Sequence, residues 1–159
     1  MWGVDLGSGA GLPGLFLALH WRGSRWRLVE AKRRRARALV EAVAELGLGT
    51  RVGVFAQRAE AVSRLEGWRG AHDVATARSF GPPGVTAECA APLLEVGGRL
   101  LVSEPPGETG ERWPEGALGV LGLRAEGLAG RAARVMVLRQ AEPCPERYPR
   151  RAPHKRPLF

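Results

Sequence analysis

Residues 5–14, DLGSGAGLPG, place four glycines and an acid within ten residues near the start of the chain. A short apolar run over residues 2–6 precedes them and predicts a strand. Pro13, followed by apolar residues 15–19, predicts a helix that begins directly after the glycines. Because glycine lets a ligand approach the backbone closely, this strand-to-helix turn predicts a binding site for a small molecule.

The same alternation of strand and helix continues beyond the glycines. Apolar positions recur at helical spacing from Lys32 to Leu46, with arginines on the opposite face and Gly47 placed to end the helix. The further predicted strands cover 26–30, 52–56, 73–77 and 99–103, with helices over 60–66 and 85–95. Strands that alternate with helices predict an α/β fold, a mostly parallel sheet with helices on both faces.

The end of the chain breaks this alternation. A loop rich in proline and glycine follows Glu104, and after a short helix two closing strands are expected over 122–128 and 133–141, adding an antiparallel strand to the sheet. Residues 144–159 hold four prolines and five arginines or lysines, so we expect an extended basic arm that does not pack. The expected organisation is one domain, 1–146, followed by an arm, 147–159.

Composition limits the possible partners. The chain has 159 residues and a net charge of +8, because 24 lysines and arginines face 16 acids, and this excess indicates a polyanionic partner such as nucleic acid. No apolar run is long enough for a membrane span and no leader is recognised, so we expect a soluble, cytoplasmic protein. Cys89 and Cys144 stand far apart, with no metal-ligand spacing around them, so no metal site is expected.

The acid in the glycine segment distinguishes two cofactor classes. Gly9, Gly11 and Gly14 fit the dinucleotide spacing, whereas Gly7, Gly9 and Gly11 fit a second spacing equally well. A carboxylate at Asp5 would disfavour a pyrophosphate at the helix start. S-adenosylmethionine carries an ammonium and a sulfonium and no phosphate, so the loop suits this cofactor better.

Two further acids follow the next predicted strands. Glu30 ends the second strand, where a carboxylate can accept hydrogen bonds from ribose hydroxyls. Ala59 and Glu60 follow the third strand, and we expect an amide or carboxylate there to contact the adenine edge. Three acids at successive strand ends favour a nucleoside site over solvent-exposed acids.

These residues resemble a known family. The motifs are DLGSGAGLPG, LVEAKRRRARAL, RAEAV, DVATARSF, LLEVGGRLL, and YPRR followed by KRPL, which together span nearly the whole chain. They are similar to those of the bacterial small-subunit (16S) ribosomal RNA guanosine-7 methyltransferases, the glucose-inhibited division protein B family. The resemblance implies a Rossmann-like methyltransferase with cofactor contacts at Gly7, Leu12, Glu30, Ala59, Glu60 and Arg78.

The expected chemistry needs no catalytic residue. N7 of guanine has an available lone pair, so no base must remove a proton, and positioning the nitrogen against the methyl carbon supplies most of the catalysis. Arg78 is expected to orient the cofactor carboxylate or a substrate phosphate. The expected partner is ribosomal RNA or the small ribosomal subunit. The tail residues predicted to bind its phosphates are Arg147, Arg150, Arg151, Lys155 and Arg156.

The chain also departs from the family pattern. It starts at the first strand, where the family has a preceding helical segment, and Glu104 stands where the family has a lysine-glycine pair. Two alternatives therefore stay open, a small-molecule methyltransferase and an inactive cofactor- or RNA-binding module. A nicotinamide-dependent oxidoreductase is a more distant alternative, since fold alone does not define function.

Overall fold

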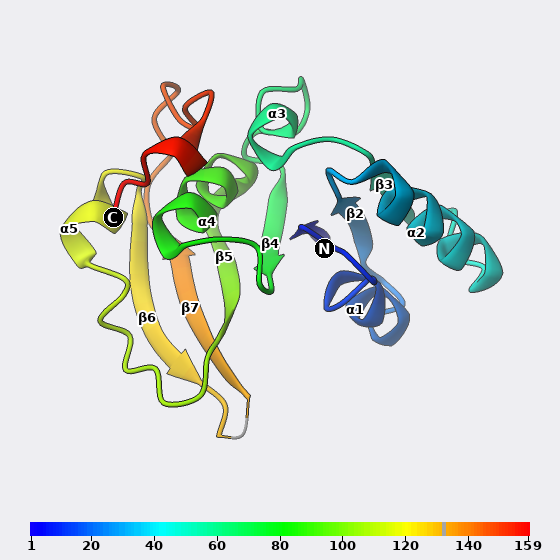
Figure 1. Cartoon of the computed structure of the whole chain (residues 1–159), viewed down its shortest axis with the longest axis horizontal. Coiled ribbons are helices and arrows are strands. Elements are labelled where there is room, and N and C mark those ends of the chain that lie inside the picture. Colours follow the sequence, from blue (N-terminus) through cyan, green and yellow to red (C-terminus); the bar gives the residue numbers. More distant parts are fainter. Residues whose placement is uncertain (132) are drawn as a thin grey trace.

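A computed structural model describes residues 1–131 and 133–159 of the chain (Figure 1). These residues contain a seven-stranded sheet in the order β3-β2-β1-β4-β5-β7-β6. Neighbours from β3 to β5 are parallel, and β7 runs antiparallel to both β5 and β6, which confirms the predicted α/β fold. The strands are β1 (Trp2–Leu6), β2 (Arg25–Val29), β3 (Val52–Phe55), β4 (His72–Ala77), β5 (Leu94–Glu104), β6 (Leu123–Ala129) and β7 (Arg134–Gln140).

The helices follow the expected order but differ in length. They are α1 (Gly14–His20), α2 (Arg33–Glu45), α3 (Ala59–Val62), α4 (Pro83–Ala90) and α5 (Glu115–Gly119), with single 3-10 turns at Ala91–Leu93 and Pro153–Lys155. The helix predicted over 60–66 is a single turn, Ala59–Val62. The helix predicted over 85–95 was wrong at its end, since Leu94 already pairs with His72 as the start of β5.

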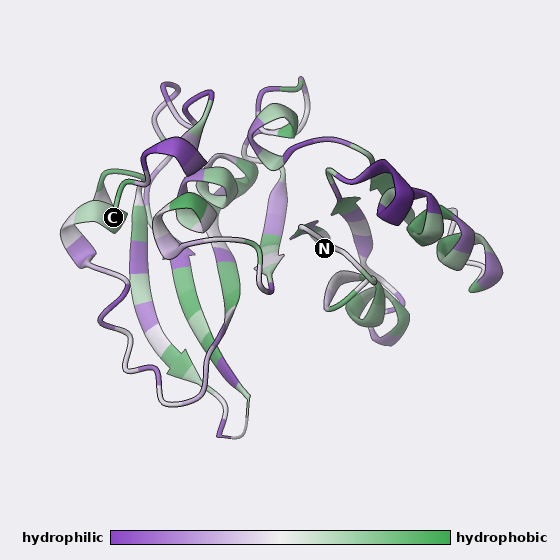
Figure 2. Ribbon diagram, in the orientation of Figure 1, coloured by the Kyte–Doolittle hydropathy of each residue, from purple (hydrophilic) through white to green (hydrophobic). Residues whose placement is uncertain are grey.

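Helices cover both faces of the sheet and form two cores. On one face α1 and α2 pack over β1–β3, with Trp26, Leu28 and Leu39 buried between them. The outer face of α2 is hydrophilic, most strongly in its first turn (Figure 2). On the other face α4 is buried throughout, against apolar side chains of β5 and β7 such as Leu100 and Leu138. The carboxyl ends of the parallel strands are left free to form a site.

The tail does not form the extended arm that we expected. Tyr148 and Pro153 are buried, and Arg69 donates hydrogen bonds to the carbonyl oxygens of Cys144, Pro145 and Tyr148. The prediction was wrong because Arg150 pairs with the buried Glu88 carboxylate of α4, which holds the tail against the domain. Among residues 1–131 and 133–159, none of the helices combines the length and apolar character needed to cross a bilayer.

Candidate functional site

The glycine loop between β1 and α1 adopts a backbone that side chains disfavour. Gly7, Gly9 and Gly11 have φ values of 69°, 53° and 93°, in the left-handed region that favours glycine. A Cβ atom on Gly7 would also lie 2.9 Å from Cδ2 of Phe80, in the loop that follows β4. The glycines therefore allow the loop to turn sharply and to contact the end of β4.

Most N–H groups of this loop already have partners inside the protein. Gly7 and Ser8 both donate to the Val29 carbonyl, at 2.9 and 3.0 Å, and this fastens the loop to the end of β2. At the start of α1 the Leu15 N–H donates to the Gly11 carbonyl at 2.8 Å, and Pro13 has no N–H. The loop and helix-start N–H groups with internal partners are those of Gly7, Ser8, Gly9, Gly11, Gly14 and Leu15.

Asp5 lies beneath the loop and does not line the cavity described below. Its side chain is buried, where Oδ1 accepts the Thr76 hydroxyl at 2.6 Å and Oδ2 accepts the Gly14 N–H at 3.3 Å. Burial raises the pKa of Asp5 to about 6 although these hydrogen bonds act in the opposite direction. Asp5 therefore joins β1, β4 and the start of α1, and it shapes the loop from below.

Glu30 lies at the end of β2, as the sequence predicted. Its Oε2 accepts the Gly9 N–H at 3.0 Å, and its Oε1 accepts the Lys32 N–H at 2.8 Å. Each carboxylate oxygen has a second lone pair, so the fixed carboxylate can still accept hydroxyl groups. The side chain is 5 % exposed and faces a cavity beside the loop.

This cofactor cavity has a volume of about 200 Å³ and lies across the ends of β1, β2, β3 and β4. Of the predicted site residues, Gly7, Glu30 and Ala59 line it. The lining residues that the sequence analysis missed are Val29, Ala31, Lys32, Arg35, Gln57, Ser79 and Phe80. Apart from Arg35, which lies in α2, each is at the end of a strand or within three residues of it, and this position is the one signal that would have found them.

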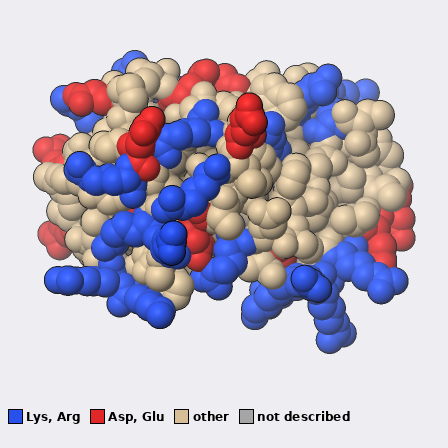
Figure 3. All heavy atoms as spheres, turned by 90° about the horizontal axis from the view of Figure 1, so that it is seen from above, with Lys and Arg blue, Asp and Glu red and all other residues tan. Residues whose placement is uncertain are grey.

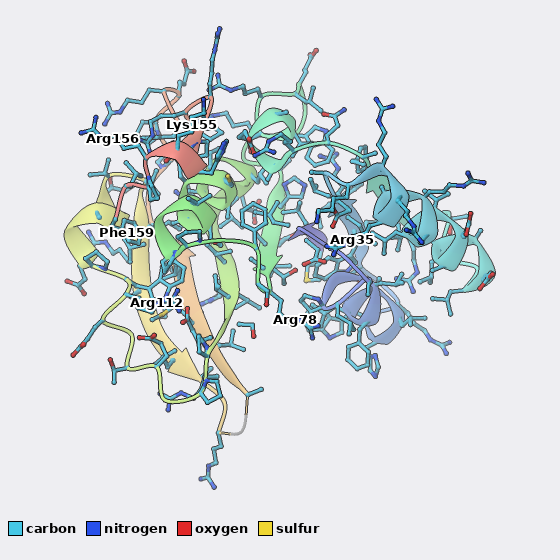
Figure 4. All side chains as sticks on the ribbon, viewed as in Figure 1. Arg35, Arg78, Arg112, Lys155, Arg156 and Phe159 are labelled. Atoms are coloured by element: carbon cyan, nitrogen blue, oxygen red, sulfur yellow. The ribbon has the colours of Figure 1, made fainter. Side chains whose placement is uncertain are left out.

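The remaining predicted cofactor contacts lie outside this lining. The Leu12 side chain is 44 % exposed, and the Glu60 carboxylate pairs with Arg58 at 2.6 Å. Arg78 is exposed at the end of β4, and its positive charge acts on Asp5 to lower the pKa of that carboxyl. Figure 4 shows Arg35 and Arg78 on the α1–α2 side of the molecule, whereas Arg112 and Phe159 lie on the β6 side.

The predicted phosphate-binding residues of the tail divide into two groups. Arg150 forms a two-pronged ion pair with Glu88, at 2.8 and 2.6 Å, and the Glu88 side chain has no exposed surface. Arg150 thus holds the tail against α4, which differs from its predicted role. The exposed cations of the tail are Arg147, Arg151, Lys155 and Arg156. Figure 3 shows many blue side chains on the face that carries the tail and α3.

The sequence of residues 3–105 matches the GidB family, described as rRNA small subunit methyltransferase G. The chain belongs to the GidB family. A ribosomal RNA small subunit methyltransferase G from Rubrobacter xylanophilus is 37% identical over 98% of this chain and 64% of its own length. Its counterpart from Carboxydothermus hydrogenoformans is 36% identical over 98% of this chain and 70% of its own length. The chain therefore spans about two thirds of these GidB relatives.

Solved structures with the same fold are more distant in sequence. The structure of P. horikoshii TYW2 in complex with MeSAdo superimposes with a TM-score of 0.66 at 15% identity, over 87% of this chain and 56% of its own. A mutant of MtNAS in complex with S-adenosylmethionine gives a TM-score of 0.64 at 19% identity, over 90% of this chain and 55% of its own. At these identities the likeness establishes the fold of this GidB chain.

Proposed function

We propose that this GidB chain binds S-adenosylmethionine in the cofactor cavity and transfers its methyl group to N7 of a guanine in small-subunit ribosomal RNA. The observation that supports the cofactor class most strongly is the internal pairing of the loop. A dinucleotide pyrophosphate needs free N–H groups at the turn and helix start. Here six of these groups have partners within the protein, and Pro13 has none to offer.

The lining of the cavity fits a nucleoside without phosphate. Glu30 is fixed by the N–H groups of Gly9 and Lys32, so its carboxylate can accept ribose hydroxyls with little further ordering. Gly7 brings bare backbone against the cavity, and Ala59 leaves room near the end of β3. Gln57 adds an amide, a group able to donate to and accept from the edge of a base.

The reaction asks the protein mainly to position its reactants. When bound, S-adenosylmethionine supplies a methyl group attached to a positively charged sulfur. The N7 lone pair of guanine forms the new bond to carbon as the carbon–sulfur bond breaks, and the bond electrons stay on sulfur. No proton moves in this step, so the site needs no general base. Ser79 and Phe80 lie at the end of the cavity away from Glu30's strand, where an incoming base would meet the methyl group.

Ribosomal RNA as the partner is supported by charge and by the names of the relatives. Arg147, Arg151 and Lys155 are exposed on the tail, and Arg35 adds a cation at the cofactor cavity. Cations that neutralise phosphates release counterions, so RNA affinity should fall steeply as salt rises. Association with the assembled small subunit belongs to the same proposal.

The test is transfer of a radiolabelled methyl group to small ribosomal subunits isolated from cells that lack their own guanine methylation. We expect the label to be found in the RNA, and hydrolysis of that RNA should release the label as 7-methylguanine. Label found only in small molecules would support a small-molecule methyltransferase instead. A protein that binds S-adenosylhomocysteine and transfers nothing would be a binding module, and thermal stabilisation by NAD alone would indicate an oxidoreductase.

A further inference from the structure

A second cavity adjoins the cofactor cavity and shares the wall formed by Ser79 and Phe80. It has a volume of about 260 Å³ and extends from the loop after β4 to the end of β5 and Trp113. Ser79 has a φ of 52°, an uncommon conformation for a residue with a side chain. Because β4 lies between β1 and β5 in the sheet, the second cavity lies on the far side of this wall from the glycine loop. We refer to it as the base cavity.

Two charged residues, Glu104 and Arg112, line the base cavity. The Glu104 side chain is 2 % exposed and stands at the end of β5, on the wall away from the cofactor cavity. Its Oε2 accepts Nη1 of Arg112 at 3.0 Å, and its Oε1 accepts Nε1 of Trp113 at 2.8 Å. These two donors hold the carboxylate in one orientation, and each oxygen keeps a lone pair for another donor.

A buried carboxylate that can only accept hydrogen bonds selects a ligand with adjacent donors. The N1–H and the N2 amino group of guanine form such a pair, whereas adenine presents an acceptor at N1. These guanine donors lie on the opposite side of the purine from N7. A guanine that directs N1–H and its amino group to Glu104 therefore directs N7 back toward the wall and the cofactor cavity.

We propose that Glu104 recognises the N1–H and N2 amino edge of the target guanine, an inference that rests on the proposed function. The same contact assists the methyl transfer. As the bond from N7 to carbon forms, positive charge passes from the sulfur to the purine. A carboxylate fixed at N1–H interacts more strongly with this charged purine than with neutral guanine, so it stabilises the transition state more than the bound substrate.

A competing explanation gives Glu104 only a structural role, since its ion pair with Arg112 fastens the loop between β5 and α5. Arg112 also meets a second carboxylate, Glu108, at 3.7 Å. Loss of either carboxylate weakens the hold of Arg112 on the loop, so a purely structural role predicts similar effects for Glu104→Gln and Glu108→Gln. Recognition of guanine predicts different effects. Glu104→Gln removes the charge and replaces one of the two acceptor oxygens by a donor, so the side chain can no longer accept from both N1–H and the amino group. Glu108→Gln leaves the Glu104 carboxylate and its ion pair with Arg112 in place.

The experiment compares kcat/KM for methyl transfer to RNA that carries guanosine, inosine or 1-methylguanosine at the target position. Inosine lacks the amino group and 1-methylguanosine lacks N1–H, while both keep N7. We expect wild-type protein to prefer guanosine over inosine by about tenfold or more, since unpaired polar groups in a site reject such analogues, and to leave 1-methylguanosine unmethylated. Glu104→Gln should lower the guanosine value and bring the guanosine-to-inosine ratio close to one, whereas Glu108→Gln should keep the ratio.

Two controls separate the possible failures. Calorimetric affinity for S-adenosylhomocysteine should be the same for Glu104→Gln and wild type, which shows that the variant is folded with an intact cofactor cavity. The comparison of guanosine, inosine and 1-methylguanosine uses wild-type protein. It therefore tests the inference even if the Glu104→Gln variant does not fold. Equal wild-type rates on all three RNAs, or an unchanged ratio in Glu104→Gln, would overturn the role of Glu104 alone. Wild-type protein that methylates none of the RNAs would overturn the proposed function, and this inference with it.

Discussion

The cofactor half and the tail-facing half of the molecule are built in different ways. In the cofactor half, β1–β3 with α1 and α2, the cavity wall is held at neighbouring strand ends, where the Glu30 carboxylate accepts the N–H groups of Gly9 and Lys32. In the tail-facing half, β4–β7 with α4 and the tail, the end of the chain packs against elements that are far from it in the sequence. Arg150 reaches Glu88 from 62 positions away, and the ring of Phe159 meets Trp113 at 6.3 Å between centroids.

This difference separates two tasks of the protein. The cofactor cavity depends on local backbone geometry, so it forms wherever the glycine turn and the parallel strands form. The base cavity depends on Trp113 and on α4, and both are held by the end of the chain, since a Cβ on Gly84 would lie 2.6 Å from the Phe159 carbonyl oxygen. We therefore expect changes in the tail to affect stability and the base cavity, and changes in the glycine loop to affect cofactor affinity.

The largest expected effect comes from Arg150→Met. This substitution leaves the Glu88 carboxylate buried without its cation, and breaking a buried pair in this way costs about 4 kcal/mol of unfolding free energy. Chemical denaturation should detect the loss. The neighbouring exposed residue provides the matched control, because Arg151→Met should change the unfolding free energy by less than about 0.5 kcal/mol. Equal stability of the two variants would show that the tail is not fastened through Arg150.

The same contrast explains what the sequence could predict. The mostly parallel α/β fold, the glycine turn and the position of Glu30 follow from local patterns, because the ends of parallel strands meet at one edge of a sheet. The role of Arg150 could not be predicted, since no pattern in the sequence connects it with Glu88. For Asp5, the spacing shows that it lies near the end of β1 but does not show that its side chain turns under the loop toward Thr76.

Two buried groups on adjacent strands, Asp5 near the end of β1 and His72 at the start of β4, predict opposite pH dependences. Burial raises the pKa of Asp5 from 3.8 to about 6, so the folded state binds more protons than the unfolded state between these values. The contribution of Asp5 to stability is thus full below about pH 4 and falls as pH rises to about 6, by about 3 kcal/mol. Burial lowers the pKa of His72 from 6.5 to about 4, so its contribution falls as pH decreases through this range.

Urea unfolding of Asp5→Asn and His72→Asn between pH 4 and 7 tests both signs. The unfolding free energy of wild type minus that of Asp5→Asn should decrease with rising pH. The difference between wild type and His72→Asn should increase with rising pH, because burial disfavours the charged imidazole and outweighs the opposing effect of the hydrogen bond to the Leu93 carbonyl. Parallel curves for all three proteins would contradict both assignments.

A smaller effect is expected from Gly7→Ala. Alanine in the left-handed region costs about 1–2 kcal/mol of unfolding free energy, and its Cβ would press on Phe80 at the edge of the cofactor cavity. Affinity for S-adenosylhomocysteine, measured by calorimetry, should fall about tenfold, equal to about 1.4 kcal/mol. Gly47→Ala is the control, since Gly47 also has a positive φ, of 65°, but has no neighbour within 4 Å of an added Cβ. If Gly47→Ala lowered the affinity for S-adenosylhomocysteine as much as Gly7→Ala does, the glycine loop would have no specific role in binding the cofactor.

The most direct measurement is a crystal structure of the chain with S-adenosylhomocysteine. The ribose hydroxyls should lie on the Glu30 carboxylate, the adenine should lie toward Ala59 and Gln57, and the sulfur should face Ser79 and Phe80 at the base cavity. A ligand bound elsewhere, or NAD in the same cavity with its pyrophosphate on the glycine loop, would contradict the account.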